Sequence, residues 1–566
     1  MSYQVENRFV KNDKYFWVVV FLLVSIVYLT SINRPLRDAE SKYAEIPREM
    51  IVTGDWVTPR LDFARYFTKP PLTFWVTAVA YKIFGVHPWV ARLTNIMWAF
   101  LAAYLLGILA SWMYGAGTGR IAAVVFILTA EVFTYCLDAG IEFGLISCII
   151  ASLTAFWIYV NDGRKLYLRL FYLGLGLSFL AKGILGFALP ATIAGLYLIC
   201  SGRLREVWKF LDVPGLVILG LGVLPWTIAM SMRHPDFLKC FVINEHFGAF
   251  LGKRDSNDAL FPTGLFLALS AGEFFPWILY LPIIIRGTIL ALKEGGEEKE
   301  KVLFLGAWLF VPLMVFSLSK SKVDFYGMHF YPPLLILLAM QLRRTLMEKQ
   351  MTSHRLWSYP WLLVPVLAIV SLVFLKSQES SQLVEGLGIP SIGVAYEFLI
   401  TAAVLGFLIF FCWTRKKTRH AFAVIAIFMI FFFYFTEKMF VAAYPDDSMK
   451  FAADKYNQVA KEGDILFSDE LPEFAHIAIL PYYTGKRAYL LRDQKNSKLY
   501  FLLKDRMELC FNEDQFKQNV IEQGKIYLVG KTKKTIRRLD KLGLGYRILA
   551  RSDGKALFVV MAHLKD

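Results

Sequence analysis

Charged residues and cysteines are both scarce in this sequence. Only 19% of the 566 residues are Asp, Glu, Lys or Arg, whereas soluble proteins average about 25%. The six cysteines are dispersed and form no Cys-X-X-Cys pair, which argues against a disulfide framework or a thiolate zinc site. No small-residue cleavage site follows the first apolar run, from Tyr15 to about Ile32, so we expect a retained helix rather than a signal peptide.

Apolar residues are abundant, at 56% of the chain, and they recur in long runs. Each run has roughly 18–22 residues, the length that crosses about 30 Å of hydrocarbon. The sequence therefore predicts a mainly α polytopic membrane protein with about thirteen transmembrane helices. The predicted spans are 15–33, 90–113, 119–136, 141–160, 167–182, 184–200, 211–231, 263–285, 302–319, 325–342, 357–375, 394–413 and 419–436.

The net charge of +16 is best explained by cytoplasmic loops and anionic membrane lipids, so we expect no nucleic-acid partner. Lys and Arg gather in alternate connections, around 120, 164–169, 203–209, 343–344 and 414–420. The positive-inside rule places these connections and the N-terminus in the cytoplasm. With thirteen crossings, everything after about 437 lies outside.

Three regions on the predicted outer side are more than short turns. They are the connection 34–89, with helix-like stretches at 40–52 and 72–84, the segment 232–262, and the C-terminal part. In that last part a helix-like stretch, 448–463, precedes strand-like runs at 464–469, 525–530 and 556–564. We expect a transmembrane domain over 1–437 and a small α/β domain over 438–566.

Ionisable and aromatic residues from several connections meet at the predicted outer ends of the spans. Taken singly each has an ordinary explanation, such as a lysine that extends to the interface or a carboxylate at a helix start. Their convergence at one level is the feature to be explained. The set comprises Asp38, Glu40, Lys42, Tyr43, Lys69, Asp138, Glu142, Lys182, Glu245, His246, Lys320, Lys322 and Tyr326.

Cations and carboxylates at one membrane surface suit one kind of chemistry in particular. Lys and Arg neutralise a phosphate leaving group, and a neighbouring carboxylate acts as a general base or stabilises an oxocarbenium-like centre. A phosphate-activated sugar carried on a lipid needs both. Lys69 is a strong candidate because the Pro-Pro pair that follows it fixes the backbone direction.

Several motifs resemble those of the lipid-linked-sugar glycosyltransferases related to the protein O-mannosyltransferases. They include "DAESKYAEIPREM", "RYFTKPPLTFW", "AKGILGFALP" and "SLSKSKVDFYGMHFYPPL", and they run in family order over roughly residues 20–340. Within that superfamily the sequence is most similar to the undecaprenyl phosphate–4-amino-4-deoxy-L-arabinose lipid A transferases. The resemblance implies a fold of the GT-C type and an inverting transfer, on the periplasmic face of the bacterial inner membrane, from an undecaprenyl-phosphate sugar to a lipid A phosphate.

The resemblance also suggests roles for residues. Lys69 corresponds to the cation that holds the donor phosphate, with Lys182 as a second, and Tyr326 corresponds to a tyrosine of the donor cavity. Lys42 and Tyr43 stand where an Arg-Tyr pair is usual. Lys320 and Lys322, just before Tyr326, complete the candidate phosphate-binding set.

Three departures from the family pattern leave alternatives open. The usual acidic pair reads Asp-Ala-Glu, so Asp38 and Glu40 compete for the catalytic role. We favour Asp38, as a residue that caps a helix starting after Ala39, with Glu40 orienting Lys42. The aspartate of the second outer loop matches either Asp138 or Glu142, which are four residues apart and would share a helix face.

The third departure concerns metal. Thr68 stands where a glutamate that helps to bind a metal is expected, which leaves His246 without that companion. A zinc site at His246 would lack a ligand unless oxygen or nitrogen donors elsewhere replaced it, so zinc is the less favoured alternative and we predict activity that is insensitive to chelators.

Two other functions use the same outer charges. A related transferase would add its sugar to protein or to another envelope glycan. A lipid transporter would carry ionisable residues at mid-membrane depth, whereas here they cluster at span ends. We therefore expect an enzyme, acting as a monomer with membrane lipids, the lipid-linked donor and lipid A as partners.

The topology is directly testable. A reporter that is active only in the periplasm, fused after Asp566, is expected to be active because the charge asymmetry puts the C-terminus outside. Activity of a cytoplasm-only reporter at the same junction would contradict the span count and the shared outer level of the candidate residues.

Overall fold

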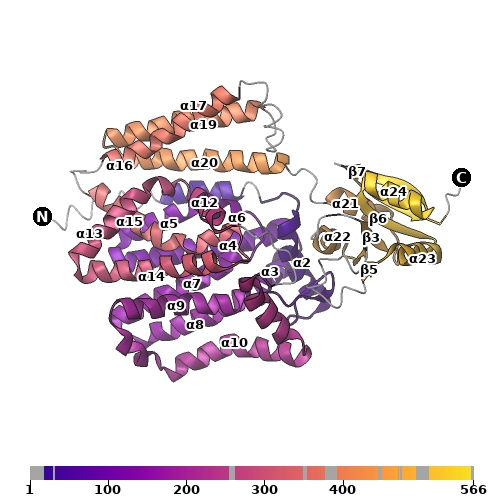
Figure 1. Cartoon of the computed structure of the whole chain (residues 1–566), viewed down its shortest axis with the longest axis horizontal. Coiled ribbons are helices and arrows are strands. Elements are labelled where there is room, and N and C mark those ends of the chain that lie inside the picture. Colours follow the sequence, from indigo (N-terminus) through magenta and orange to yellow (C-terminus); the bar gives the residue numbers. More distant parts are fainter. Residues whose placement is uncertain are drawn as a thin grey trace.

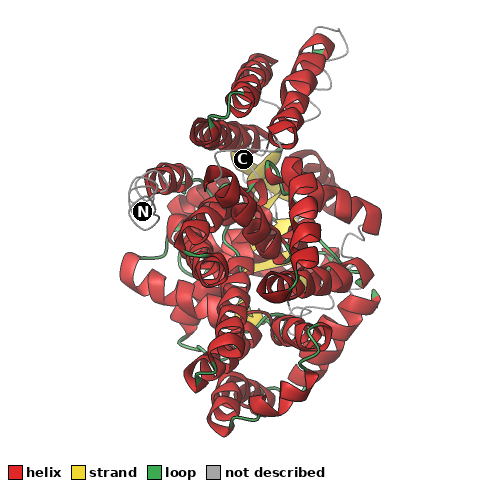
Figure 2. Cartoon of the chain, turned by 90° about the vertical axis from the view of Figure 1, so that its left-hand side faces the viewer, coloured by secondary structure: helices red, strands yellow, loops and turns green. Residues whose placement is uncertain are grey.

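The chain folds into a helical bundle with a smaller sheet-containing part at one end (Figure 1). The computed structural model describes residues 18–29, 32–253, 262–347, 354–375, 392–443, 449–469, 471, 475–492, 509–552 and 554–562. We call the end of the bundle that carries α2 (Asp38–Thr53), α3 (Leu72–Phe84) and this sheet the sheet end. Figure 2 looks along the bundle from the opposite end, with the strands behind the helices.

Mostly apolar helices of different lengths form the bundle. They begin with Val18–Leu29, which carries no label in Figure 1. The others are α4 (Pro88–Tyr114), α5 (Ala116–Ile127), α6 (Ala130–Cys136), α7 (Glu142–Asp162), α8 (Lys165–Lys182), α9 (Ile184–Cys200), α10 (Val213–Arg233), α12 (Thr263–Glu273), α13 (Leu281–Glu294), α14 (Gly296–Leu318), α15 (Tyr331–Met347), α16 (His354–Ser358), α17 (Leu363–Phe374), α19 (Ile392–Thr414) and α20 (Thr418–Ala443).

Shorter helical turns connect these helices. They are η1 (Leu204–Phe210), η2 (Lys239–Gly248), α11 (Ala249–Leu251), η3 (Trp277–Tyr280), η4 (Asp324–His329) and η5 (Tyr359–Leu362).

These elements confirm the predicted fold class, a mainly α integral membrane protein. Among the described residues, seven helices are long and apolar enough to cross a membrane, or up to nine if each of two bent pairs is one span. The bends are 59° between α5 and α6 and 93° between α12 and α13. Thirteen crossings therefore remain a prediction, and the span expected at 325–342 is in fact the turn η4 followed by α15.

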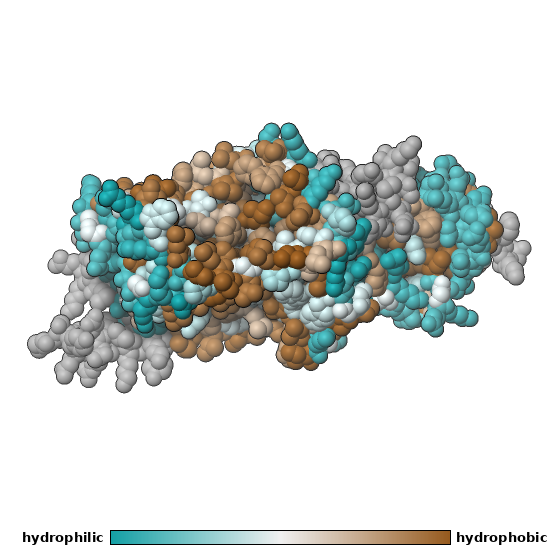
Figure 3. All heavy atoms as spheres, turned by 90° about the horizontal axis from the view of Figure 1, so that it is seen from below, coloured by the Kyte–Doolittle hydropathy of each residue, from teal (hydrophilic) through white to brown (hydrophobic). Residues whose placement is uncertain are grey.

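The surface carries the pattern expected of a membrane protein. Figure 3 shows a hydrophobic middle between hydrophilic ends, on the face that it displays. An apolar surface of this extent is stable in contact with lipid but not with water.

Small residues allow the helices of the bundle to pack closely. A Cβ atom placed on Gly174 of α8 would lie 2.6 Å from Cβ of Ser152 on α7, and one on Gly119 of α5 would lie 2.3 Å from the backbone oxygen of Gly107 on α4. Close helix approach through such residues is typical of membrane bundles, where dispersion contacts rather than hydrophobic exclusion drive association.

Between the first helix and α4, the connection forms α2, a two-stranded ribbon of β1 (Arg60–Leu61) and β2 (Ala64–Arg65), and α3. Both predicted helices are present. Helix α2 begins at Asp38 rather than after Ala39, so Asp38 is a helical residue and Arg37 occupies the N-cap position. The expectation that Asp38 caps this helix from the preceding loop is therefore wrong.

The C-terminal part is a six-stranded sheet with helices on both faces. The strand order is β5-β4-β3-β6-β8-β7, parallel from β5 to β6 and antiparallel across β8 and β7. Its strands are β3 (Leu466–Asp469), β4 (Ala488–Leu491), β5 (Cys510–Phe511), β6 (Lys525–Lys531), β7 (Gly545–Ser552) and β8 (Lys555–Met561). Its helices are α21 (Lys450–Val459), η6 (Ala475–Ile479), α22 (Leu480–Thr484), α23 (Glu513–Gln523) and α24 (Thr532–Leu542).

Strand β6 shows why β3, β6 and β8, the three predicted strands, are recognisable in the sequence. Ile526 and Leu528 pack on the face with α23 and α24, while Tyr527 and Val529 pack on the face with α21 and α22. A strand buried on both faces is a continuous apolar run. Edge strand β7 is mostly half-buried or exposed, carries arginines and was not predicted.

The sheet part docks on α2. Ile46 and Met50 of α2 share an apolar cluster with Ile477 and Leu490 of the C-terminal part. Two hydrogen bonds fix the contact: Leu36 N–H donates to the Tyr483 hydroxyl at 2.9 Å, and Ala488 N–H donates to Oδ1 of Asp62 at 3.2 Å. This docking covers the same helix that carries the first group of candidate site residues.

Candidate functional site

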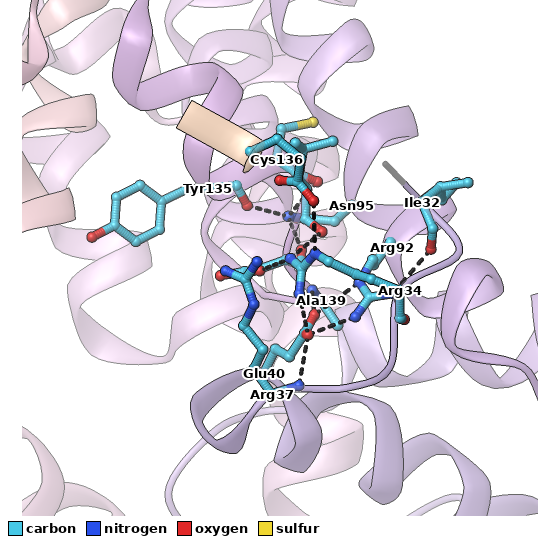
Figure 4. Close-up of polar contacts among 12 residues, drawn as sticks. Ile32, Arg34, Arg37, Glu40, Arg92, Asn95, Tyr135, Cys136 and Ala139 are labelled. Carbon is cyan, nitrogen blue, oxygen red and sulfur yellow. Dashed lines mark hydrogen bonds and ion pairs between the residues drawn. The ribbon is translucent and has the colours of Figure 1, made fainter. Parts of the chain in front are cut away.

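Glu40, near the start of α2, is the centre of a buried ion-pair cluster (Figure 4). Its side chain is only 1% exposed. Arg92 of α4 binds it through two nitrogens, Nη2 to Oε1 at 2.6 Å and Nε to Oε2 at 3.1 Å, and Arg34 Nη1 adds a contact to Oε1 at 2.9 Å. Paired nitrogens of one guanidinium on one carboxylate form the strongest kind of side-chain ion pair.

Backbone groups complete the coordination of Glu40. The N–H groups of Arg37 and Ala139 donate to its two oxygens at 2.9 and 3.0 Å. Burial raises the pKa of Glu40, but Arg92, Arg34 and these hydrogen bonds outweigh it and lower the pKa to about 2. Glu40 is therefore a fixed carboxylate that joins α2, α4 and the connection 137–141.

Asp138 lies in this last connection and forms the edge of the cluster. It forms an ion pair with Arg34 Nη2, and Asn95 Nδ2 donates to its backbone oxygen at 2.7 Å. The Asp138 side chain is 36% exposed, far more than that of Glu40. Burial and the charge of Glu40 raise the pKa of Asp138, while Arg34 and Arg37 lower it less, so the net shift favours proton acceptance.

Asp138 and Glu142 do not share a helix face, contrary to the expectation. Asp138 precedes α7, and Glu142 is the first residue of that helix. Asp138 belongs to the Glu40 cluster, and Glu142 belongs to a second cluster described below.

Of the other residues predicted on α2, Lys42 Nζ lies 4.9 Å from the ring centroid of Tyr43, whose ring stacks on Phe74 of α3. The side chain of Asp38 lies outside the described part of the structure, so its choice over Glu40 as the catalytic residue stays a prediction.

The second cluster brings together residues from α7, α8 and η4. Lys182 Nζ donates to both oxygens of Glu142, at 2.7 and 2.6 Å, and lies 4.5 Å from the ring centroid of Tyr326. His329 Nε2 is 3.9 Å from the same carboxylate. Lys182 and Glu142 are 5% and 14% exposed at the side chain, so this is a largely buried pair rather than a solvated interface lysine.

Gly183 explains why Lys182 sits at this point. Helix α8 ends at Lys182, and Gly183 follows with φ of +74°, a conformation that glycine adopts readily. A Cβ atom on Gly183 would lie 2.6 Å from Nε2 of His246 and 2.7 Å from the ring of Phe241. Only glycine fits there without displacing these rings.

The lysine of the Lys-Pro-Pro motif is more accessible. Lys69 is 24% exposed at the side chain, and its Nζ lies 3.7 Å from Oε2 of Glu245, which is buried. Lys69 is thus held near the second cluster by a loose ion pair and remains partly exposed.

Lys320 and Lys322 differ from each other. Lys320 is exposed and packs beside Gly252. Lys322 is buried and donates to the Thr263 hydroxyl at 2.7 Å and to the backbone oxygen of Ser317 at 3.1 Å. Lys322 would have to give up these hydrogen bonds to bind a phosphate. Lys320 is exposed and is therefore the more accessible of the two.

The residues around His246 do not fit a metal ion. Its Nδ1 contacts the backbone oxygen of Phe241 at 2.6 Å, and its Nε2 lies 3.1 Å from Ile184 N–H, so backbone groups occupy both ring nitrogens. Burial lowers the pKa of His246, and Lys69 and Lys182 lower it further. Thr68 offers a neutral hydroxyl, and the described residues include no group of three or more His, Cys, Asp or Glu placed to hold a metal.

Four charged residues near this site were not predicted from the sequence: Arg34, Arg37, Arg92 and Glu437. Oε1 of Glu437 lies 3.6 Å from Nε of Arg34. An arginine four residues into an apolar helix, as Arg92 is in α4, is a signal that could have been used, because a buried guanidinium needs carboxylate partners. Glu437, near the end of α20, has no such signal because its partner is about 400 residues away in the chain.

Comparison with known proteins supports the resemblance found in the sequence. The sequence model of the dolichyl-phosphate-mannose-protein mannosyltransferase family matches residues 68–228. Two undecaprenyl phosphate-alpha-4-amino-4-deoxy-L-arabinose arabinosyl transferases from strains of Pseudomonas fluorescens are 28% and 31% identical to the chain, each over 63% of it. The chain is similar to these transferases over that part of its length. The matched part spans 64% and 61% of their own length.

The fold is shared over nearly the whole chain with a solved relative. The structure of ArnT from Cupriavidus metallidurans bound to undecaprenyl phosphate matches with a TM-score of 0.79 at 21% identity, and the match covers 96% of this chain and 97% of that one. The chain therefore has the same fold as that protein, and the predicted GT-C architecture is confirmed.

The misfit of a metal leads to a prediction about chelators. Sugar transfer by the purified protein is expected to be unchanged by EDTA or 1,10-phenanthroline, because the ring nitrogens of His246 are already occupied by backbone groups. Transfer rates with and without chelator provide the measurement. Loss of activity on chelation, reversed by added zinc, would contradict this reading of the site.

Proposed function

We propose that the protein transfers 4-amino-4-deoxy-L-arabinose from undecaprenyl phosphate to a phosphate of lipid A, as an inverting glycosyltransferase. The observation that carries this proposal is the second cluster, where Lys182, Tyr326 and Lys69 gather beside Glu142 and Glu245 in a homologue of the arabinosyl transferases. Cations in a largely buried setting are the elements that a phosphate leaving group needs.

In this proposal the two lysines have different tasks. Lys69, the accessible cation, contacts the donor phosphate directly when the lipid-linked sugar binds. Lys182 stays paired with Glu142 and keeps positive charge beneath the Tyr326 ring, where it stabilises the charge that develops on the phosphate. Lys320 adds an exposed cation at the rim.

The carboxylate that serves the acceptor is, in this proposal, Asp138. Both oxygens of Glu40 are engaged by arginines and backbone N–H groups, whereas Asp138 is partly exposed and has a raised pKa. Asp138 accepts the proton of the attacking phosphate hydroxyl, or orients that phosphate when it arrives as the dianion. Asp38 remains the alternative for this role.

The reaction then balances without a further reactant. An oxygen of the lipid A phosphate forms a bond to the anomeric carbon from the face opposite the donor. The bond from the anomeric carbon to the donor phosphate oxygen breaks, and undecaprenyl phosphate leaves with the electron pair. Attack from the opposite face inverts the anomeric configuration.

The setting of the site follows from the charge pattern of the loops. We place the protein in the bacterial inner membrane with the sheet end in the periplasm, because the Lys- and Arg-rich connections lie in the other predicted compartment. We also propose a division into a transmembrane domain over 1–437 and a periplasmic α/β domain over 438–566, with the second domain docked on α2.

A second function has one observation in its favour. The family model that matches residues 68–228 is described for transfer of mannose to protein, and the same cluster would serve a protein acceptor. The acceptor that gains mass distinguishes the two functions.

The proposed function predicts a change in lipid A. Mass spectrometry of lipid A from cells with the gene is expected to show one added aminopentose per modified phosphate, which is absent from cells without it. Replacing Lys69 by Ala should lower the modification roughly ten- to a hundredfold because a charge-assisted phosphate contact is lost. Lys299→Ala on the first turn of α14 is the matched control.

Unchanged lipid A in cells that express the folded protein would contradict the lipid A proposal. Added hexose on envelope proteins in those cells would support the second function instead. Full activity of Lys69→Ala would show that Lys69 is an ordinary solvated lysine with no role in binding the donor phosphate.

A further inference from the structure

A group of carboxylates lies beside the second cluster and has no part in the mechanism above. Glu131 of α6, Glu273 at the end of α12 and Asp324 at the start of η4 form this group, which we call the acidic cluster. The turn η4 packs against both α6 and α12. The three carboxylates are close enough for their charges to interact with one another, and the Tyr135 hydroxyl is hydrogen-bonded to Asp324.

Glu131 is the member that points to a missing partner. It is 1% exposed, and neither of its oxygens has a hydrogen-bond partner of good geometry within the described parts of the chain, where the Met328 N–H is a neutral donor close to it. The Tyr331 hydroxyl is nearby, but its hydrogen is donated to the backbone oxygen of Ser270 at 2.6 Å. One oxygen of Glu273 is likewise buried without a partner.

Several other buried carboxylates in this protein are neutralised by cations. Glu40 has Arg92, Glu142 has Lys182, and Glu45 has Arg48 at 2.6 Å. No Lys, Arg or His among the described residues forms an ion pair with a member of the acidic cluster. Buried carboxylates without a counter-charge are costly, so they either hold protons or await a cation.

The position of η4 relates this cluster to the phosphate-binding residues. Asp324 and Tyr326 are two residues apart on this turn, and Tyr326 covers Lys182 while Asp324 faces Tyr135. The Phe325 ring, between them in sequence, packs edge-on against the Tyr135 ring at 5.0 Å. Figure 4 shows that the Tyr135 ring points away from the arginines around Glu40. Cationic and acidic groups therefore flank one short turn.

A ligand that matches this arrangement carries an anionic group for the lysines on one side of the turn and a cationic group for the carboxylates on the other. We propose that the acidic cluster binds the protonated amino group of the donor sugar, while Lys69 and Lys182 face its phosphate. This inference rests on the proposed function and identifies the residues that determine which donor sugar is accepted. Glu131, Glu273 and Asp324 would select an amino sugar over the same sugar with a hydroxyl, because a hydroxyl leaves the carboxylates uncompensated.

Binding rather than turnover gives the sharpest test. The full-length protein in lipid nanodiscs would be titrated with three lipids: undecaprenyl phosphate, undecaprenyl-phosphate 4-amino-4-deoxyarabinose, and undecaprenyl-phosphate arabinose. Wild type is expected to bind the amino donor roughly ten- to a hundredfold more tightly than its hydroxyl analogue. Glu131→Gln should abolish this preference, with unchanged affinity for undecaprenyl phosphate.

Two further variants guard against a folding defect at the buried Glu131. Glu273→Gln and Asp324→Asn change partly exposed members of the cluster and should each reduce the preference. Glu300→Gln is the matched control, since Glu300 accepts a hydrogen bond from Tyr197 at 2.9 Å outside the acidic cluster, and it should keep the full preference.

Equal affinity of wild type for the two sugar donors would overturn the inference, as would an undiminished preference in all three cluster variants. Transfer of both sugars without preference would leave the proposed function standing and refute only this inference. A preference for the amine that depends on Glu131, in a protein that modifies no lipid A, would support this inference and refute the proposed transfer to lipid A.

Discussion

The arrangement of the candidate site depends on the ion pairs between Glu40 and two arginines, Arg92 and Arg34. One carboxylate ties together the start of α2, helix α4 and the connection that carries Asp138. Folding lowers the pKa of Glu40 from its ordinary 4.5 to about 2, so the stabilisation is complete above about pH 4.5 and is lost as the pH falls toward 2. In a buried position such a pair is costly to break, because either partner alone is an uncompensated charge.

This constraint separates two kinds of carboxylate that look alike in the sequence. Glu40 is saturated with donors and holds the backbone in place, while Asp138 shares Arg34 with it and keeps a partly exposed side chain. Glu142, which follows the connection 137–141, forms a similar buried ion pair with Lys182. Each cation that we assign to the donor phosphate, Lys69 or Lys182, is thus positioned by a carboxylate of its own.

The sequence predicts the helices, the membrane class and the set of residues at the sheet end, because apolar runs and charge asymmetry are local signals. It does not predict partners across long separations. Lys182 is 40 residues from Glu142 and Arg34 is 104 residues from Asp138, and periodicity carries no information on such pairs. The wrong choice of Asp38 as a cap has a local cause instead: the helix begins at Asp38, and the carboxylate that accepts the Arg37 N–H is Glu40. Edge strand β7 was not predicted because its exposed arginines interrupt the alternation of apolar and polar residues that marks a strand.

One comparison tests the separation of roles most directly: thermal unfolding and sugar transfer of Glu40→Gln and Asp138→Asn, beside Glu300→Gln as control. We expect Glu40→Gln to lose about 3–5 kcal/mol of stability, because Arg92 is left buried without its counter-charge. Asp138→Asn should unfold near the wild-type temperature and transfer sugar roughly 100-fold or more slowly. A Glu40→Gln protein with wild-type stability and no transfer, together with an active Asp138→Asn protein, would contradict the account and make Glu40 the catalytic carboxylate.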